Sequence, residues 1–188
     1  MSSKLEKLKK SQTLASIRRE SIDGLRIQGF VLAYSKDLIL IQYVYDFNVD
    51  GIMVLRRSDI SEIDTDKTDI FQTQILKDEG LFAEVDFQKE YDVKDWPTVL
   101  NSVGKDYGLV IVEDEISEDP EFLLGEIQDI KNNSVSILGF TGAANWHKEP
   151  TEINYEDISS FQAGNNYSKM YKRYFERNAL TSGSTGRS

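Results

Sequence analysis

The sequence predicts a mainly β protein with short helices (α+β), built as two tandem small five-stranded barrels of the SH3/Sm-like type, each followed by a helix. Three observations predict this architecture. A pair of apolar runs separated by a short polar break occurs twice, a similar phrase follows each pair, and a helix-like stretch ends each copy. Alternating apolar residues with a short polar break are typical of two antiparallel strands joined by a tight turn. Closing five such strands into a barrel would remove unpaired edges.

The duplication is visible when Gly29 is aligned with Gly125. The stretch "GFVLAYSKDLILIQYV" then falls on "GEIQDIKNNSVSILGF". Both copies begin with a glycine, reach a polar break and resume with a second apolar run, which is Leu38–Val44 in the first copy and Val135–Phe140 in the second. We expect these two runs to occupy equivalent places in the fold.

A shared phrase follows, "SDISEI" at 58–63 and "EDISSF" at 156–161. Asp59 lies 30 residues after the first aligned glycine and Asp157 lies 32 residues after the second. Asp after a strand suits a tight turn because its carboxylate accepts backbone N–H bonds, while the following Ile would fill the end of a barrel. The phrase therefore predicts a structural role. Helix-like stretches at 68–80 and 165–178 complete the two copies.

The second copy also indicates which secondary structure to expect at the start of the first copy. The continuous apolar run Leu109–Val112 is typical of a buried strand. By analogy, 13–19 is expected to be a strand with Ala15 and Ile17 facing inward, and only 4–10 is expected to be a short helix.

The segment between the copies contains Asp95 followed by Pro97, which predicts a helix N-cap with proline in the first turn. This helix would run over 96–103 and stop near Gly104, after a strand or loop at 84–93. The predicted organisation is a first unit with its N-terminal arm and helix (1–82), a connecting segment (83–105), a second unit with its C-terminal helix (106–178) and a disordered tail (179–188).

Composition narrows the function classes. The chain has no cysteine, which excludes disulfides, thiolate nucleophiles and cysteine-based zinc sites. No stretch of 18 consecutive apolar residues occurs, and the basic N-terminal stretch is not followed by an apolar run. These features lead us to expect a cytoplasmic protein that does not bind membranes.

Charge is unevenly distributed along the chain, whose net charge is -10. Residues 1–20 hold six basic and two acidic residues, and the rest holds 16 basic and 30 acidic ones, so the arm carries +4 and the body -14. Because nucleic-acid affinity comes mainly from Lys and Arg neutralising phosphates, the acidic body argues against a broad nucleic-acid surface. The basic arm could contact RNA or an anionic membrane, or could be a solvated terminus.

Two loops offer candidate binding residues. The histidine His147, the only one in the sequence, follows Trp146 in a predicted loop, where the large indole could anchor a partner or fold back over the barrel mouth. In the corresponding loop of the first copy, "YDFNVDG", alternating Asp46, Asn48 and Asp50 resemble the start of a calcium loop. The twelfth position, which requires Glu, is Arg57, so we expect a hairpin turn closed at Asp50 and Gly51 instead.

A third candidate is the acidic run "VEDEISEDPE" at 112–121, which includes Glu113, Asp114 and Glu115. Converging carboxylates can perform acid–base or metal chemistry, but on a strand and loop they mostly point into water. Neither "GxxxxGK" nor "GxGxxG" occurs. We therefore predict no catalytic residue, no cofactor and no metal site.

The stretches "RIQGFVLAYSKDLILIQYV…DGIMVLRRSDISEI" and "FLLGEIQDIKNNSVSILGF…TEINYEDISSF" resemble the small barrels of the Sm-like and PRC-barrel families. The PRC-barrel resemblance implies a protein-binding or adaptor module that performs no chemistry. Sm proteins that bind uridine-rich RNA place an Asn in the turn before the second strand and an Arg-Gly near the last. Here Lys36 and Asp37 occupy the first turn, Asn132 and Asn133 the second, and no Arg-Gly follows Arg57, which argues against such an RNA site.

The function expected from the sequence is a non-enzymatic protein-interaction module, either an adaptor or an inhibitor of the immunity type that neutralises a basic partner such as a toxin. Two alternatives are an Sm-like RNA-binding protein that uses the arm 1–20 and a hydrolase in which converged acids hold a divalent metal. The oligomeric state is open. The predicted partner-binding residues are Asp46, Phe47, Asn48, Asp50, Trp146, His147, Glu113, Asp114 and Glu115.

Overall fold

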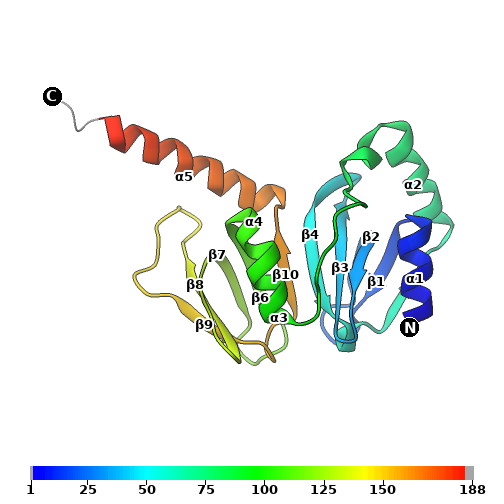
Figure 1. The fold of residues 1–188 in the computed structure, drawn as a ribbon, viewed down its shortest axis with the longest axis horizontal. Coiled ribbons are helices and arrows are strands. Elements are labelled where there is room, and N and C mark those ends of the chain that lie inside the picture. Colours follow the sequence, from blue (N-terminus) through cyan, green and yellow to red (C-terminus); the bar gives the residue numbers. More distant parts are fainter. Residues whose placement is uncertain (1, 185–188) are drawn as a thin grey trace.

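The computed structural model describes residues 2–184, and in this part of the chain ten strands form one antiparallel sheet (Figure 1). The strand order is β5-β1-β2-β3-β4-β10-β6-β7-β8-β9. The predicted mainly β class with helices is confirmed. The strands are β1 (Ala15–Arg18), β2 (Arg26–Tyr34), β3 (Leu38–Tyr45), β4 (Asn48–Arg56), β5 (Glu62–Asp64), β6 (Leu109–Asp114), β7 (Glu121–Ile130), β8 (Ser134–Gly139), β9 (Thr151–Asn154) and β10 (Ser160–Ala163).

Helices precede and follow each set of five strands, and the duplicated pattern predicted the helix that follows each set. The segment 96–107 is continuously helical, because a π-helical turn joins two short α-helices, and it ends later than Gly104. The helical segments are α1 (Ser2–Ser11), η1 (Arg57–Asp59), α2 (Lys67–Asp78), η2 (Leu81–Glu84), α3 (Trp96–Val99), the π-helical η3 (Leu100–Gly104), α4 (Lys105–Tyr107) and α5 (Asn166–Ser184). The predicted disordered tail overlaps the end of α5, and 185–188 lie outside the described residues.

The strand order repeats between the two halves of the sheet. β1 to β5 are arranged as fifth, first, second, third and fourth, and β6 to β10 are arranged in the same way. The two apolar runs that the sequence alignment paired, 38–44 and 135–140, fall on β3 and β8, the third strand of each half. The prediction that they occupy equivalent places is confirmed.

Backbone irregularities repeat as well. The register of β2 against β3 shifts between Val31 and Ala33, and that of β7 against β8 shifts at the aligned positions Ile127 and Asp129. A methyl group at Gly29 would lie 2.6 Å from the carbonyl oxygen of Gln42, and one at Gly125 would lie 2.1 Å from that of Leu138. Both glycines are therefore required because neighbouring backbone approaches too closely for a side chain.

The halves do not close into two separate barrels, so this part of the prediction is not confirmed. β4 pairs antiparallel with β10, from Leu55 opposite Ser160 to Ile52 opposite Ala163, and the sheet remains open with β5 and β9 at its ends. β10 uses one edge to pair with β6 and the other to pair with β4. Because an unpaired strand edge accepts any strand of suitable register, pairing between the halves replaces closure within each half.

The recurring "DIS" phrase has a structural role, but Ser rather than Asp makes the backbone contacts. Ser61 donates from its amide (3.0 Å) and its hydroxyl (3.1 Å) to the carbonyl of Arg18. Ser159 donates in the same way to the carbonyl of Glu113, at 2.9 and 3.0 Å. Asp59 and Asp157 interact with side chains instead. The Ile of each phrase is buried, as predicted.

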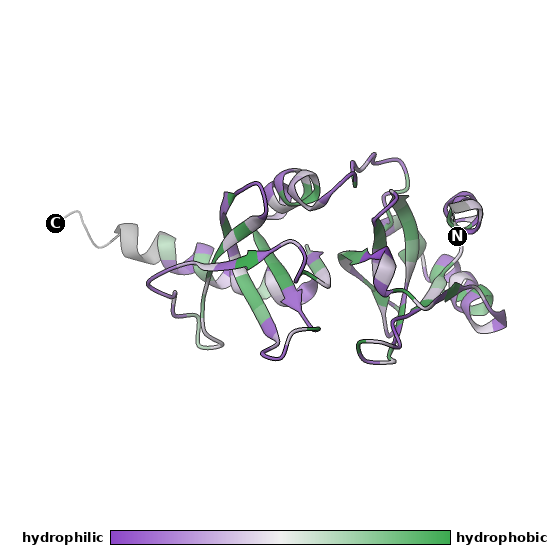
Figure 2. Ribbon diagram, turned by 90° about the horizontal axis from the view of Figure 1, so that it is seen from below, coloured by the Kyte–Doolittle hydropathy of each residue, from purple (hydrophilic) through white to green (hydrophobic). Residues whose placement is uncertain are grey.

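The apolar core runs through both halves, and the strands carry most of the apolar residues (Figure 2). Leu5 and Leu8 of α1 pack on the side of the first half that includes Ala15 and Ile17, which confirms the predicted inward-facing residues of β1. α3, η3 and α4 cover the equivalent side of the second half. α2 and α5 cover the opposite sides, and α5 extends beyond the sheet (Figure 1).

The hairpin between β3 and β4 turns at a different place from the predicted one. Tyr45 pairs with Asn48, so the turn residues are Asp46 and Phe47, both with positive φ (47° and 63°). This geometry is that of a two-residue hairpin turn in which both central residues are left-handed. Gly51 instead lies within β4, where its φ of 80° accommodates the end of β10.

Candidate functional site

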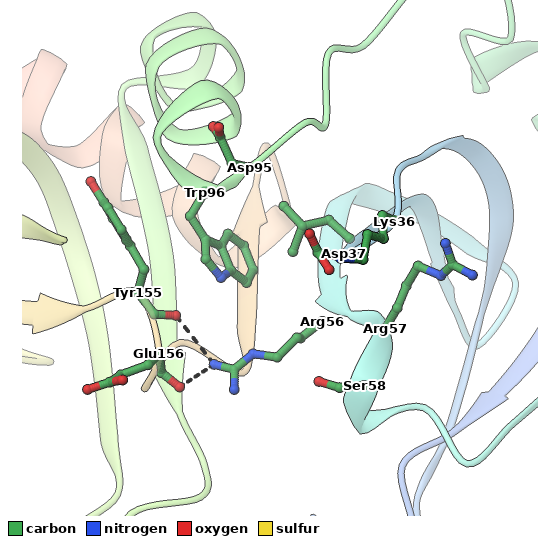
Figure 3. Close-up of a pocket in the computed structure, with 10 residues that line it drawn as sticks. Lys36, Asp37, Arg56, Arg57, Ser58, Asp95, Trp96, Tyr155 and Glu156 are labelled. Atoms are coloured by element: carbon green, nitrogen blue, oxygen red, sulfur yellow. Dashed lines mark hydrogen bonds between the residues drawn. The ribbon is translucent and has the colours of Figure 1, made fainter. Parts of the chain in front are cut away.

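A cleft of about 620 Å³ lies between the two halves of the sheet (Figure 3). It is formed where the β2–β3 turn and the end of β4 face the start of α3 and the β9–β10 turn. Because it combines segments from both copies, no single copy contains this site. The lining residues are Lys36, Asp37, Leu38, Arg56, Arg57, Ser58, Asp95, Trp96, Tyr155 and Glu156.

Arg56 connects the two halves across the floor of this cleft. Its Nη2 donates to the carbonyls of Glu156 (2.5 Å) and Tyr155 (3.4 Å) and also to that of Ile158. Its Nη1 donates to no acceptor among residues 2–184. The guanidinium is thus held in place by backbone carbonyls while part of its donor capacity remains unused.

Trp96 forms the wall opposite Arg56 and is only 7% exposed. Its indole Nε1–H has no hydrogen-bond partner in the described part of the chain, and the nitrogen is open to solvent, since it is not among the buried atoms without a partner. Figure 3 shows the indole nitrogen on the side of the ring that faces the Arg56 guanidinium. Because this nitrogen is open to the cleft, water can accept a hydrogen bond from it.

Two of the three acidic side chains that line the cleft are directed away from the space between Trp96 and Arg56. Asp95 caps α3, accepting from the backbone N–H (3.0 Å) and hydroxyl (2.6 Å) of Thr98, and these bonds hold the pKa of Asp95 below its usual value. In Figure 3 the carboxylates of Asp95 and Glu156 both point away from the space between Trp96 and Arg56. Asp37 is the third acidic residue of the cleft, and with the basic residues Lys36, Arg56 and Arg57 it gives the lining a mixed charge.

A second candidate surface lies on α5 and the loop that follows β8. Ring contacts with centroid distances of 4.8 to 6.4 Å link successive members of one continuous group. We call this group the aromatic surface. Its rings are Phe122, Phe140, Trp146, Tyr167, Tyr171, Tyr174 and Phe175.

The inner part of the aromatic surface is anchored to the core, and its outer part is exposed. Phe140, with Tyr171 and Phe175, packs on Leu109 and Leu124 of the sheet. Phe122, Trp146, Tyr167 and Tyr174 are 38% to 54% exposed, as is Met170 between them. Lys169 and Arg173 lie exposed on the same helix and make no ion pair with a described residue. The helix α5 thus carries accessible rings and, separately, cations that form no ion pair with a described residue.

The structure does not gather the predicted partner-binding residues into one surface. Trp146 packs on Phe140 (5.1 Å) and Phe175 (4.8 Å), so it is both partly folded back and 38% exposed, and it belongs to the aromatic surface. His147 follows it and donates its amide to the Gly139 carbonyl at 2.9 Å. The sequence left two possibilities for Trp146, an exposed anchor or a ring folded back onto the protein, and each describes part of this side chain.

The predicted residues of the first-half loop lie at the β3–β4 turn. Asp46 and Phe47 are the turn residues, and the Asn48 side chain donates to the carbonyls of Tyr45 (3.3 Å) and Asp46 (3.1 Å). Asp50 accepts from the backbone N–H of Asn166 at 2.6 Å, at the start of α5. This carboxylate thus joins the first half to the helix that carries the aromatic surface.

The three acidic candidates are used in contacts within the protein. Glu113 accepts hydrogen bonds from Ser160 and Gln162. Glu115 accepts two bonds, at 2.7 and 2.9 Å, from the buried guanidinium of Arg19 in the other half.

Asp114 accepts from the backbone N–H groups of Ile116 and Ser117, both at 3.0 Å. Burial disfavours its charged form, but the hydrogen bonds from Ser117 and Ile116 outweigh burial and lower the pKa of this carboxyl. All three predicted acidic residues therefore use their carboxylates in hydrogen bonds within the protein.

Sequence reasoning missed Trp96 and Arg56 as site residues, because only the fold places them opposite each other. It also missed most of the aromatic surface. The stretch "NNYSKMYKRYFERN" carried a usable signal, since Tyr167, Tyr171 and Tyr174 recur at helical spacing with basic residues between them. That spacing indicates an aromatic face along the helix.

Comparison with known protein families, curated proteins and solved structures gave no match. The resemblance to Sm-like and PRC barrels therefore stays a prediction. Among residues 2–184, no group of three or more His, Asp or Glu side chains is placed to hold a metal ion. In the same range, no helix combines the length and apolar character needed to cross a membrane.

Proposed function

We propose that this protein is a non-enzymatic protein-interaction module that docks a partner through the aromatic surface of its second half. The observation that carries the proposal is the continuous chain of seven rings, four of which are substantially exposed. Contiguous exposed apolar groups of this kind mark interaction sites, and Trp, Tyr and Arg dominate the energetics of protein interfaces. The adaptor function expected from the sequence is retained; of the predicted loops only the one with Trp146 stays in the docking surface, which is now centred on α5.

Charge on α5 indicates the chemistry of the partner. Lys169 and Arg173 are exposed on the helix that carries most of the rings, whereas the acidic candidates Glu113, Asp114 and Glu115 are engaged within the protein. A partner that presents apolar side chains flanked by carboxylates would satisfy both the rings and the cations. We therefore favour an acidic docking segment over a basic partner at this surface.

RNA binding by the basic arm has less structural support. The arm contains α1, whose Leu5 and Leu8 are buried against the sheet. Lys4 pairs with Asp64 at 3.2 Å and Lys10 pairs with Glu6 at 3.1 Å. Stacking of single-stranded bases on the exposed rings is a different route to nucleic acid, and the experiment below distinguishes it from protein binding.

The finer architecture is part of this proposal. We propose that the two halves descend from one duplicated five-stranded unit of the SH3/Sm-like type. Repeated strand order, equivalent register shifts and identical contacts of Ser61 and Ser159 support it. In that duplication, the second copy acquired the docking surface. A cytoplasmic location and the absence of a cofactor remain predictions.

The proposal is tested by photocrosslinking followed by reconstitution. A photoreactive amino acid is placed at Tyr174 and, in a matched control, at Phe71, which is exposed on the equivalent helix α2. A protein captured from Tyr174 and not from Phe71 is purified and titrated with the unmodified chain. We expect Tyr174→Ser and Trp146→Ser each to weaken binding about tenfold or more, and Phe71→Ser to leave it unchanged.

Tyr174→Ser is the decisive variant, because Trp146 also packs on the core and its loss could disturb folding. Equal capture from both positions, or equal affinity of the Tyr174 and Phe71 variants, would overturn the proposal. Capture of nucleic acid instead, with affinity that falls steeply with salt and is lost in Arg173→Gln, would replace protein docking with single-strand binding.

A further inference from the structure

We propose that the two free edges of the sheet, β9 and β5, match each other as a joint between copies of this chain, and that three carboxylates and a proline on these edges keep the copies apart. The occupant that each edge would accept is the opposite edge of a second copy. Both edges lie outside the aromatic surface, and the inference does not depend on the proposed function.

The first argument is the repeated strand order. Within the chain, the fourth strand of the first half, β4, pairs with the fifth strand of the second half, β10. The remaining fourth and fifth strands, β9 and β5, each pair with only one strand among residues 2–184. The β4–β10 joint therefore has an unused counterpart, in which β9 of one copy would meet β5 of the next. Repetition of such a head-to-tail contact adds further copies.

The strand register shows which residues would meet in this counterpart. Counted back from the shared "DIS" phrase, Glu152 of β9 is the equivalent of Val54 of β4. The strand pairing agrees, because Val54 lies opposite Leu40 of β3, and Glu152 lies opposite the aligned Ser136 of β8. The residues of β5 and β10 follow the same phrase and are matched by the same count.

The second argument is burial at the existing joint. Val54 and Phe161 lie opposite each other in the β4–β10 pair, and both are 0% exposed. In the counterpart joint, Glu152 would take the place of Val54, and Ile63 would take the place of Phe161. An ionised carboxylate would therefore be enclosed where the existing joint holds an aliphatic side chain, which is unfavourable.

The fifth strands differ in the same direction. On β10, Ser160 is 1% exposed and Gln162 is partly buried. Their equivalents on β5 are Glu62 and Asp64, both of which are exposed. A second copy paired at this edge would enclose two more carboxylates.

Backbone features of the free edges also oppose pairing. Pro150 stands where β4 has Ile52, and β9 begins after this proline, which has no N–H to donate. β5 and β9 contain only three and four residues. Short edge strands, charged side chains and proline are the features by which natural sheets avoid edge-to-edge association.

The three carboxylates pair with cations of their own chain, but these pairs are open to water. They are Lys4–Asp64 (3.2 Å), Arg18–Glu62 (3.5 Å) and Lys131–Glu152 (2.6 Å). All six side chains are 44% to 62% exposed. A second copy would remove water from both members of each pair, and this loss opposes association even if the pairs stay intact.

The test opens one edge at a time. Pro150→Ile with Glu152→Val gives β9 the residues of β4, and Glu62→Ser with Asp64→Gln gives β5 the residues of β10. Sedimentation velocity of the full chains at one ionic strength measures association. We expect the unaltered chain and each variant alone to sediment as monomers. An equimolar mixture of the two variants should form a dimer at least about tenfold more tightly than either variant associates with itself.

Two further chains sharpen the comparison. A chain with all four substitutions has both edges open and should form assemblies larger than a dimer that grow with concentration. Glu118→Gln with Glu126→Gln removes two exposed carboxylates away from both edges and should leave the chain monomeric. This control separates pairing of the edges from a general loss of negative charge.

A mixture that associates no more than its separate variants would overturn the inference. So would a β9 variant that associates with itself as tightly as with the β5 variant, because added apolar surface would then explain the contact. An unaltered chain that associates as tightly as the mixture would show that the edges are not blocked. If Pro150→Ile with Glu152→Val does not fold, Glu152→Thr alone serves for the same comparison, since threonine is neutral and favoured in strands.

Discussion

Beneath α2, Asp69 is fully buried and accepts hydrogen bonds from Ser16, Arg26 and Gln28 at 2.7 to 2.8 Å. Beneath α5, the equivalent positions of the second half hold Ile111, Phe122 and Leu124, and the aromatic surface takes the place of the carboxylate. The two helices begin in the same way, because Asp66 and Asn165 each accept a hydrogen bond from the backbone N–H three residues on. The same framework thus carries opposite chemistry on equivalent faces.

The difference lies in how completely each helix is paired within the protein. A buried carboxylate with three donors fixes the position of its helix, and the network is complete within the protein. Aromatic packing needs no complete set of partners, so rings can continue past the area that the sheet covers. The first half is therefore suited to holding the structure, and the second half to contacting something else.

The largest expected effect tests whether the halves share one backbone geometry. Gly125→Ala places a methyl group against the Leu138 carbonyl and should lower the free energy of unfolding by about 3 kcal/mol. Gly29→Ala should have a similar but smaller effect, since its methyl group would be 2.6 Å rather than 2.1 Å from the nearest backbone oxygen. Chemical denaturation measures both. Tolerance at one glycine only would mean that the two close approaches are not equivalent.

The next effect tests the polar face of α2. Asp69→Ala leaves Arg26 and Gln28 without their buried acceptor and should cost about 3 kcal/mol of unfolding free energy. Ser168→Ala, at the equivalent position of α5, removes only a local bond to the Asn165 carbonyl and should cost less than about 1 kcal/mol. Urea denaturation of the two variants checks the contrast, and similar losses would contradict it.

A smaller effect separates the two "DIS" phrases. Ser159 is fully buried and also bonds the Glu115 carboxylate at 2.7 Å, whereas Ser61 is exposed, although both donate in the same way to a carbonyl of the first strand of their half. Ser159→Ala should therefore destabilise the protein by about 1.5 kcal/mol, while Ser61→Ala should cost less than about 0.5 kcal/mol because water replaces its bonds. Thermal unfolding compares them directly. A larger loss at Ser61 would mean that burial is not what separates the two phrases.

The smallest expected effect is on the stability of the protein in acid. It concerns Asp114, whose equivalent in the first half is Arg19. The pKa of Asp114 is lowered in the folded protein, so the unfolded state binds more protons as the pH falls. Its stabilising contribution is present above about pH 4 and is lost as the pH drops through the folded pKa. Asp114→Asn should therefore flatten the fall in stability between about pH 5 and pH 2.

Stability measured against pH tests this expectation, with Glu118→Gln as the control for loss of one negative charge in the same exposed loop. An unchanged acid profile in Asp114→Asn, or the same flattening in the control, would show that the hydrogen bonds of Ile116 and Ser117 do not hold this carboxylate in its charged form.

Local features of the fold were predictable where they depend on neighbours in the sequence. The Asp95 cap and the inward-facing Ala15 and Ile17 follow from short-range pattern, and the structure confirms them. The turn at Asp46 and Phe47 was missed because both residues adopt left-handed conformations that Gly usually takes. The candidate cleft was beyond prediction, since Trp96 and Arg56 are 40 residues apart and meet only when the halves pair.

The sequence by itself determined the duplicated order of strands and helices, because apolar periodicity and close-packed glycines impose the same local geometry on both copies. Only the tertiary structure decided how the copies join. Strand edges pair through backbone groups, which are the same for every residue type. The apolar pattern of the sequence therefore does not predict that β4 pairs with β10. That pairing makes one open sheet, places Arg19 against Glu115 and creates the cleft between the halves.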